Sequence, residues 1–212
     1  MVIGFHIIGT TYGFWLPNDQ RGSGSDHVRN PALRPFGPAT KGNHGRSVAR
    51  APQNYEVRRL AREALRYDPV EFNNAQIQSV AKGFENEISE FGGTILEGAI
   101  LGTHFHLVTG QHPYDIRRFV GRLRGAATKQ LRADGLHPFQ QIVQSDGSLP
   151  SPWGRLPWVV YCFTEEDIER SIDYAKKNVL RARIAPQNWS WLTPYSQWLE
   201  ELRTGRGAAH HR

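Results

Sequence analysis

The sequence predicts an α+β protein in which helices pack on an antiparallel sheet. Short segments rich in β-branched and aromatic residues, typical of strands, alternate along the chain with longer segments of helical periodicity. Two of the strand-like segments, 94–100 and 103–109, follow one another around Gly102, as in a hairpin. Hairpin strands that helices separate from the other strands favour an antiparallel sheet covered by helices.

The N-terminal part predicts one strand followed by a long basic loop. Residues 2–12 are rich in β-branched and aromatic side chains and predict the first strand. Residues 16–54 predict the loop, because positions 21–54 hold nine Gly or Pro residues, and six Lys or Arg residues against one Asp. Such a loop fits either a solvated insertion or a segment that contacts nucleic acid.

Two helices are expected before the hairpin, and one of them has a clear apolar face. Residues 55–67 predict a short helix, and residues 74–91 a longer one that ends at two glycines. The apolar residues of the longer helix recur at helical spacing: Ile77, Val80, Phe84, Ile88 and Phe91.

The helix predicted over 114–134 has two chemically different faces. Its apolar residues lie within about 60° of one line at about 100° per residue: Ile116, Phe119, Val120, Leu123, Ala127 and Leu131. The opposite side is basic, which fits either an ordinary solvated face or contact with DNA phosphates. The candidate DNA-binding residues on it are Arg117, Arg118, Arg122, Arg124, Lys129 and Arg132.

A strand over 158–163 and a helix beginning at Thr164 complete the fold. Thr164 and Asp167 resemble a capping box, with Asp in place of the usual Glu. The helix has an apolar stripe of four residues: Ile168, Ile172, Ala175 and Val179. Tyr174 and Asn178 are four residues apart on a flank outside this stripe, where a hydroxyl and an amide oxygen can face the same point. Tyr174 is therefore not placed as a core aromatic.

Length and composition exclude several classes of protein. The 212 residues predict a single domain over 1–198 and a disordered tail over 199–212. The formal net charge of +6 favours a polyanionic partner, while the single cysteine, Cys162, excludes a disulfide framework and a zinc ribbon. Since no apolar run reaches about 18 residues, we expect no membrane partner and a location in the cytoplasm with the nucleoid.

His104 and His106 are candidate metal ligands. Side chains alternate across a strand, so both imidazoles face the same way, about 7 Å apart, while Phe105 faces the core. The tripeptide alone also fits a pair of structural histidines. His6, on the first strand, can approach this site provided that its strand neighbours residues 103–109.

Together these segments resemble a known family. The chain resembles the HUH single-tyrosine transposases, and especially the REP-associated branch. The resemblance lies in four successive elements: a strand with His-hydrophobe-His (104–106), a basic helix, a Trp-led strand, and a helix with Tyr-x-x-x-Asn-x-x-Arg-Ala (174–182). The stretch Thr-Thr-Tyr-Gly-Phe-Trp-Leu-Pro-Asn-Asp-Gln-Arg-Gly (10–22) is also similar to the start of that group. The resemblance spans about residues 5–195 and is thin in the loops.

The resemblance implies a fold, a reaction and a site. It implies the HUH, ferredoxin-like sandwich, with His104, His106 and Asn178 as ligands of Mg²⁺ or Mn²⁺ and Tyr174 as the nucleophile on a DNA phosphate. It further implies a 5′-phosphotyrosine and a free 3′-hydroxyl on single-stranded or hairpin DNA. Family members act as monomers or as homodimers, and we expect a monomer here.

Two departures from the family pattern keep other functions open. Val179 and Arg183 stand where the family often has Pro and Gly, so the last helix is free to continue or to end differently. The histidine pair follows Gly102-Thr103, where the family often has Pro-Asn or Pro-Glu. A catalytically degenerate, transposase-derived protein that binds DNA hairpins is therefore the main alternative to an active endonuclease and strand transferase. A metal-binding protein unrelated to DNA would leave the net charge of +6 unexplained.

Overall fold

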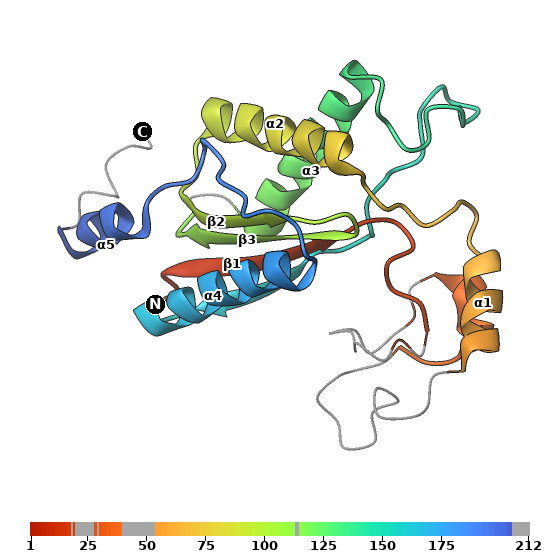
Figure 1. Ribbon diagram of the computed structural model, residues 1–212, viewed down its shortest axis with the longest axis horizontal. Helices are drawn as coiled ribbons and strands as arrows, with labels where there is room; N and C mark the ends of the chain where they lie inside the picture. Colours follow the sequence, from red (N-terminus) through yellow and green to blue (C-terminus); the bar gives the residue numbers. More distant parts are fainter. Residues whose placement is uncertain (18, 20–27, 29, 40–53, 113–114, 205–212) are drawn as a thin grey trace. The chain divides into compact units, whose positions relative to one another are not determined.

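A computed structural model describes residues 1–17, 19, 28, 30–39, 54–112 and 115–204. These residues form two compact units, one comprising Met1–Thr10 with Glu71–Arg212 and the other Thr11–Val70. The sheet and all candidate catalytic and metal-binding residues belong to the first unit (Figure 1). The single domain expected over 1–198 stays a prediction.

The first unit is built on a four-stranded antiparallel sheet, which confirms the predicted α+β class. The strands are β1 (Gly4–Thr10), β2 (Ile95–Ile100), β3 (His104–Gly110) and β4 (Trp158–Cys162), in the order β2-β3-β1-β4. The N-terminal strand therefore lies inside the sheet, between β3 and β4. This order brings β1 next to the strand that carries the His-Phe-His sequence.

Alternation along β3 separates two kinds of side chain. Phe105 is 1% exposed and contacts Phe84 in an edge-to-face arrangement, with ring centroids 5.2 Å apart. Its ring covers the backbone of Gly9, its partner on β1, where an added Cβ atom would lie 2.1 Å from Phe105 Cζ. A glycine is needed at this position because the aromatic ring fills the space of a side chain.

Helices α2 (Asn74–Phe91) and α3 (Ile116–Ala133) pack together on the Phe105 face of the sheet (Figure 1). A capping box between Asn73 and Gln76 starts α2, and the side chain of Asp115 caps α3. All six residues of the apolar face predicted for α3 are buried.

Helix α4 (Glu165–Arg181) covers the opposite face of the sheet (Figure 1). The predicted capping box of Thr164 and Asp167 is present, and all four residues of the predicted apolar stripe are buried. The helix ends in a Schellman motif, in which Arg183 N–H donates to Leu180 O (3.0 Å) and Ile184 N–H donates to Val179 O (3.5 Å). Arg183 adopts a φ of 56°, the left-handed conformation that favours glycine.

The chain after α4 covers the outer edge of β2 and then forms a further helix. The side-chain amide of Gln187 donates to Ile100 O (2.7 Å) and accepts from Ile100 N–H (2.8 Å), as a neighbouring strand would. Helix α5 (Tyr195–Thr204) follows, so the tail predicted from residue 199 is wrong for 199–204. Trp198 is 6% exposed in an apolar cluster, and this burial holds the helix in place.

The second unit contains a 3-10 helix, η1 (Pro31–Phe36), and α1 (Tyr55–Glu63). The expectation of a continuous loop over 16–54 is thus wrong for residues 31–36. Leu33 is buried against Leu16 and Ala61, which gives this turn a small core of its own. Residues 20–27, 29 and 40–53 of the predicted basic loop lie outside the described residues.

Candidate active site

Three rings from three separate segments meet on the α4 face of the sheet. His106 of β3 lies 5.4 Å from Tyr174 of α4 and 5.3 Å from His6 of β1, measured between ring centroids. His6 and Tyr174 lie 5.7 Å apart. His104 joins this group at 5.1 Å from His106, on the face that strand alternation predicts.

A hydrogen bond of 3.0 Å connects His6 Nε2 to His106 Nδ1. His6 is 6% exposed and His106 is 2% exposed, so the bond lies in the protein interior. The condition set by the sequence is met, because β1 pairs with β3. Since its Nε2 atom is used in this bond, His6 approaches His106 as a hydrogen-bond partner.

Burial holds both of these imidazoles in the neutral form at pH 7. Desolvation lowers the pKa of His6 to about 4. Desolvation, with smaller contributions from the neighbouring charges of His104 and His6, lowers the pKa of His106 to about 3. Neutral imidazoles are the form that binds metal ions.

The donor atoms of the two β3 histidines suit a divalent cation. His106 Nε2 is buried and has no hydrogen-bond partner among the described residues. His104 is half-buried, and its Nδ1 lies 3.1 Å from Thr103 Oγ1. A buried ring nitrogen with no protein partner, beside a second imidazole on the same face, fits a metal ligand. No group of three or more His, Cys, Asp or Glu side chains in the described part of the chain is placed to share an ion.

Tyr174 lies beside His6 and His106 on one flank of α4, and Asn178 follows it one turn later on the same helix. Tyr174 is 46% exposed, which leaves its hydroxyl accessible, as expected for a residue outside the apolar stripe. The amide nitrogen of Asn178 donates to the backbone oxygen of Tyr174 (2.8 Å). This bond uses the amide nitrogen of Asn178 and leaves the amide oxygen, the atom that binds Mg²⁺ or Mn²⁺.

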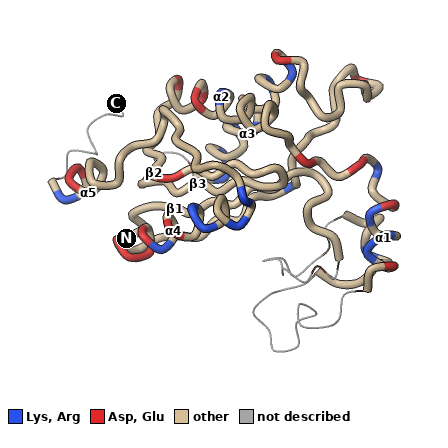
Figure 2. Tube along the Cα trace, in the orientation of Figure 1, with Lys and Arg blue, Asp and Glu red and all other residues tan. Residues whose placement is uncertain are grey.

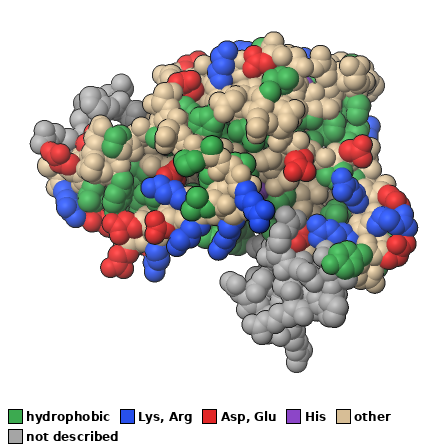
Figure 3. Space-filling model, in the orientation of Figure 1, with side chains coloured by type: hydrophobic (Ala, Val, Ile, Leu, Met, Phe, Trp, Pro, Cys, Tyr) green, Lys and Arg blue, Asp and Glu red, His purple; other side chains and the backbone are tan. Residues whose placement is uncertain are grey.

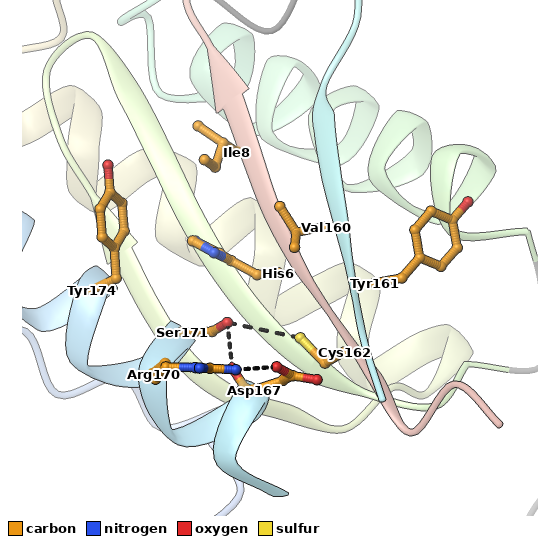
Figure 4. A pocket seen from close by; sticks show the side chains of 9 residues that line it. All are labelled: His6, Ile8, Val160, Tyr161, Cys162, Asp167, Arg170, Ser171 and Tyr174. Carbon is orange, nitrogen blue, oxygen red and sulfur yellow. Dashed lines mark hydrogen bonds and ion pairs between the residues drawn. The ribbon is translucent and has the colours of Figure 1, made fainter. Parts of the chain in front are cut away.

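A hollow of about 380 Å³ adjoins Tyr174 between α4 and the strands β1 and β4 (Figure 4). Its lining is mixed, and the imidazole of His6 lies beside the apolar side chains of Ile8 and Val160. Tyr161 also borders the hollow, but its ring points away from Tyr174 (Figure 4) and packs on Phe5, with centroids 5.5 Å apart. Of these two tyrosines, Tyr174 alone lies against the histidines.

Basic side chains accompany Tyr174 along α4, a feature that the sequence analysis did not assign to the site. Figure 2 shows acidic residues at the start of α4 and basic residues in its second half, and Figure 3 shows basic side chains along the surface of this helix. Lys177 and Arg181 are exposed and lie one and two turns after Tyr174 on the same side of the helix. Their spacing from the tyrosine was the signal available in the sequence. We call this pair the α4 basic row.

The candidate DNA-binding residues of α3 lie on the other side of the sheet, and two of them have internal partners. Arg122 forms an ion pair with the buried carboxylate of Glu87. Arg124 donates to the backbone oxygen of Gly154, and burial lowers its pKa to about 10. The remaining four are exposed: Arg117, Arg118, Lys129 and Arg132. DNA contact by any of the six stays a prediction.

Comparison with known proteins finds structural similarity and no match at the level of sequence families. No protein-family model matches the chain, and a search of curated proteins finds no match. A solved structure of a REP-associated tyrosine transposase bound to a REP hairpin aligns over 97% of this chain and 82% of that chain, with a TM-score of 0.43 and 12% identity. The chain resembles a tyrosine transposase in structure.

A second solved structure also aligns with most of the chain. A Deinococcus radiodurans R1 protein provisionally named a transposase aligns over 88% of this chain and 94% of its own, with a TM-score of 0.37 and 13% identity. Likenesses at this level concern the general architecture, so the function has to come from the residues of the site. None of the helices in the described residues is long and apolar enough to cross a membrane.

Proposed function

We propose that the protein is a metal-dependent, single-stranded DNA endonuclease and strand transferase that acts through a covalent bond to Tyr174. The observation that carries the proposal is the position of Tyr174, half-exposed and in ring contact with His106, whose Nε2 atom is buried and unpartnered among the described residues. A nucleophilic hydroxyl beside a cation site is the arrangement that phosphodiester cleavage requires.

His104 and His106, with the amide oxygen of Asn178, are the residues that would hold Mg²⁺ or Mn²⁺. The bound ion would supply Lewis-acid stabilisation of charge on the non-bridging phosphate oxygens. The protein itself keeps the imidazole of His106 neutral by burial and holds Tyr174 on a helix whose apolar stripe is packed on the sheet. A tyrosine fixed in this way loses little entropy when it meets a phosphate.

The reaction conserves the phosphodiester energy. Attack by Tyr174 Oη on phosphorus forms the Oη–P bond and breaks the P–O3′ bond, and the departing 3′-oxygen gains the equivalent of the proton that the tyrosine loses. The 5′-phosphate stays on Tyr174 until a 3′-hydroxyl attacks it, which restores the tyrosine and joins the strand. No nucleotide cofactor is needed in this sequence of steps.

The α4 basic row supports a path for the DNA strand past Tyr174. Lys177 and Arg181 are on the same side of the helix as the tyrosine, within two turns, and α4 rises about 1.5 Å per residue. Both cations therefore lie within about 11 Å of Tyr174 along the helix axis. They can meet consecutive phosphates of an extended strand. The strand would then lie along the face of the sheet that carries the histidines.

A covalent-adduct assay tests the proposal. The protein is incubated with a labelled DNA hairpin bearing single-stranded flanks and with Mn²⁺, and the products are separated on a denaturing gel. Tyr161→Phe is the matched control, because Tyr161 borders the same hollow but points away from Tyr174. We expect an adduct with the wild type and with Tyr161→Phe, and none with Tyr174→Phe or without metal.

Two results would overturn the proposal in different ways. An adduct that persists in Tyr174→Phe would remove Tyr174 as the nucleophile. DNA binding without any adduct, unchanged by EDTA and by Tyr174→Phe, would establish the alternative of a retained hairpin-binding protein. The end of α4 bears on this choice, because Arg183 adopts the left-handed conformation that a glycine would favour and the helix ends there in a Schellman motif.

A further inference from the structure

The hydrogen bond between His6 and His106 constrains where the proton of each ring resides. A neutral imidazole has one N–H group and one nitrogen lone pair, so one ring must donate and the other must accept. Two arrangements are possible. In one, His106 donates from Nδ1 and its Nε2 atom carries a lone pair; in the other, His6 donates from Nε2 and His106 carries its proton on Nε2.

The surroundings of His106 Nε2 distinguish the two arrangements. This atom is buried and has no hydrogen-bond partner among the described residues, so a proton on it would have no protein acceptor there. A lone pair on this atom, in contrast, is available to a cation, because the His106 ring lies beside His104 and Tyr174. The arrangement in which His106 donates from Nδ1 therefore leaves its Nε2 atom free to bind a metal ion. The arrangement in which His6 donates leaves a buried N–H group on His106 without an acceptor among the described residues.

We propose that His6 is a positioning residue that accepts a hydrogen bond from His106 Nδ1–H and thereby keeps the Nε2 lone pair of His106 directed at the metal site. The inference deepens the proposed function and rests on it for the role of the metal. His6 acts through His106, in the way that outer-shell partners orient metal-binding histidines in other proteins. The bond also fixes the angle of the His106 ring, because both partners are on adjacent strands of one sheet.

The test begins with the tautomer of His106 in the metal-free protein. Long-range ¹⁵N–¹H correlation spectra of ¹⁵N-histidine-labelled protein at pH 7.5 distinguish a proton on Nδ1 from one on Nε2. We expect His106 in the Nδ1–H form and His6 with an unprotonated Nε2. A His106 ring that carries its proton on Nε2 would overturn the inference, and this measurement does not depend on any variant folding or on any DNA reaction.

Two variants then separate positioning from packing. His6→Gln retains a carbonyl acceptor close to the position of Nε2, whereas His6→Leu has no acceptor, and both remove the buried ring. We expect Mn²⁺, measured by water-proton relaxation, to bind His6→Leu about 10–100-fold more weakly than the wild type and to bind His6→Gln within a few-fold of it. A merely structural role of His6 would weaken binding equally in both variants and would overturn the inference.

The outcomes also separate this inference from the proposed function. A wild-type protein that binds Mn²⁺ and shows the expected tautomer, but forms no adduct through Tyr174, would overturn the proposed reaction and leave the role of His6 standing. Equal Mn²⁺ affinity in the wild type and His6→Leu, with adduct formation intact, would overturn the role of His6 and leave the reaction standing.

Discussion

The two faces of β3 carry different kinds of side chain, although their residues alternate along seven positions of the same strand. On one face Phe105 and Leu107 are packed against aromatic and aliphatic side chains of the core, and they stabilise the fold by burial. On the other face His104 and His106 meet Tyr174, and one buried ring nitrogen has no protein partner among the described residues. The comparison teaches that side-chain alternation alone places an aromatic core residue on one face of β3 and both imidazoles on the other, where Val108 continues a second apolar cluster.

Replacing Phe105 should have the largest effect on stability. Phe105→Ala removes a ring that contacts Phe84 and covers Gly9, and it leaves a cavity. We expect a loss of about 3–5 kcal/mol in the free energy of unfolding, measured by urea denaturation. Protein that remains folded should still form the Tyr174 adduct, and a folded Phe105→Ala protein without adduct activity would show that the two faces are coupled.

Replacing the neighbouring histidine should affect metal binding more than stability. His106→Leu removes the hydrogen-bond partner of the buried His6 Nε2 atom, so we expect a loss of about 1–3 kcal/mol in the free energy of unfolding. Mn²⁺ affinity should fall at least about 100-fold, or about 3 kcal/mol. A loss of stability as large as that of Phe105→Ala would contradict the division between the faces.

The neutral histidine pair should make the metal-free protein sensitive to acid. The folded-state pKa values of His6 and His106, about 4 and about 3, lie below the value of 6.5 for an unperturbed histidine. Between these limits the unfolded chain binds more protons than the folded chain, so stability is complete above about pH 6.5 and falls as the pH drops. Each histidine contributes a loss of about 2 kcal/mol between pH 7 and pH 5, so we expect about 4 kcal/mol for the pair in EDTA, measured by urea denaturation. The double variant His6→Gln/His106→Leu should show a flatter profile, and an equally steep one would assign the effect to other groups.

The α4 basic row should contribute more to DNA binding than the basic residues of α3. We expect Lys177→Ala and Arg181→Ala each to weaken binding of a single-stranded probe by about 1 kcal/mol and to lower the salt dependence by about one phosphate contact. Arg117→Ala and Lys129→Ala are the matched changes on the other face of the sheet. If these α3 variants lose more affinity than the α4 variants, the strand follows α3 instead.

The smallest effect is expected where α4 ends. Arg183 adopts a φ of 56°, so Arg183→Gly should relieve the cost of a side chain in the left-handed region and raise the free energy of unfolding by up to about 1 kcal/mol. Metal affinity should not change, since Arg183 lies beyond the last turn of the helix. Arg183→Ala is the control, because alanine retains the Cβ atom, and it should not stabilise the protein.

Local patterns in the sequence were sufficient to predict the four strands, the helices α1 to α4 and the apolar faces of α3 and α4. The apolar stripes of α3 and α4, the capping box of Thr164 and the common face of His104 and His106 all depend on residues a few positions apart. Helical and strand periodicity therefore determines them before any tertiary contact forms.

Features that depend on distant residues were not predictable in this way. The contact between His6 and His106 follows from the order of the strands, because the two residues are 100 positions apart in the sequence. Likewise, nothing in the periodicity of α3 distinguishes Arg122, which has a buried partner on α2, from the exposed arginines of the same helix. The tail was predicted wrongly because the burial of Trp198 depends on residues of β2, β3 and β4.

The interior position of β1 has a consequence during protein synthesis. This strand is made first, yet both of its neighbours come later, β3 about 100 residues on and β4 later still. The nascent chain must therefore carry His6 without its partner until β3 has left the ribosome, and Tyr174 joins them only after α4 is complete. The cluster of His6, His106 and Tyr174 therefore forms only after residues 165–181 have been made, although its first member is among the first residues of the chain.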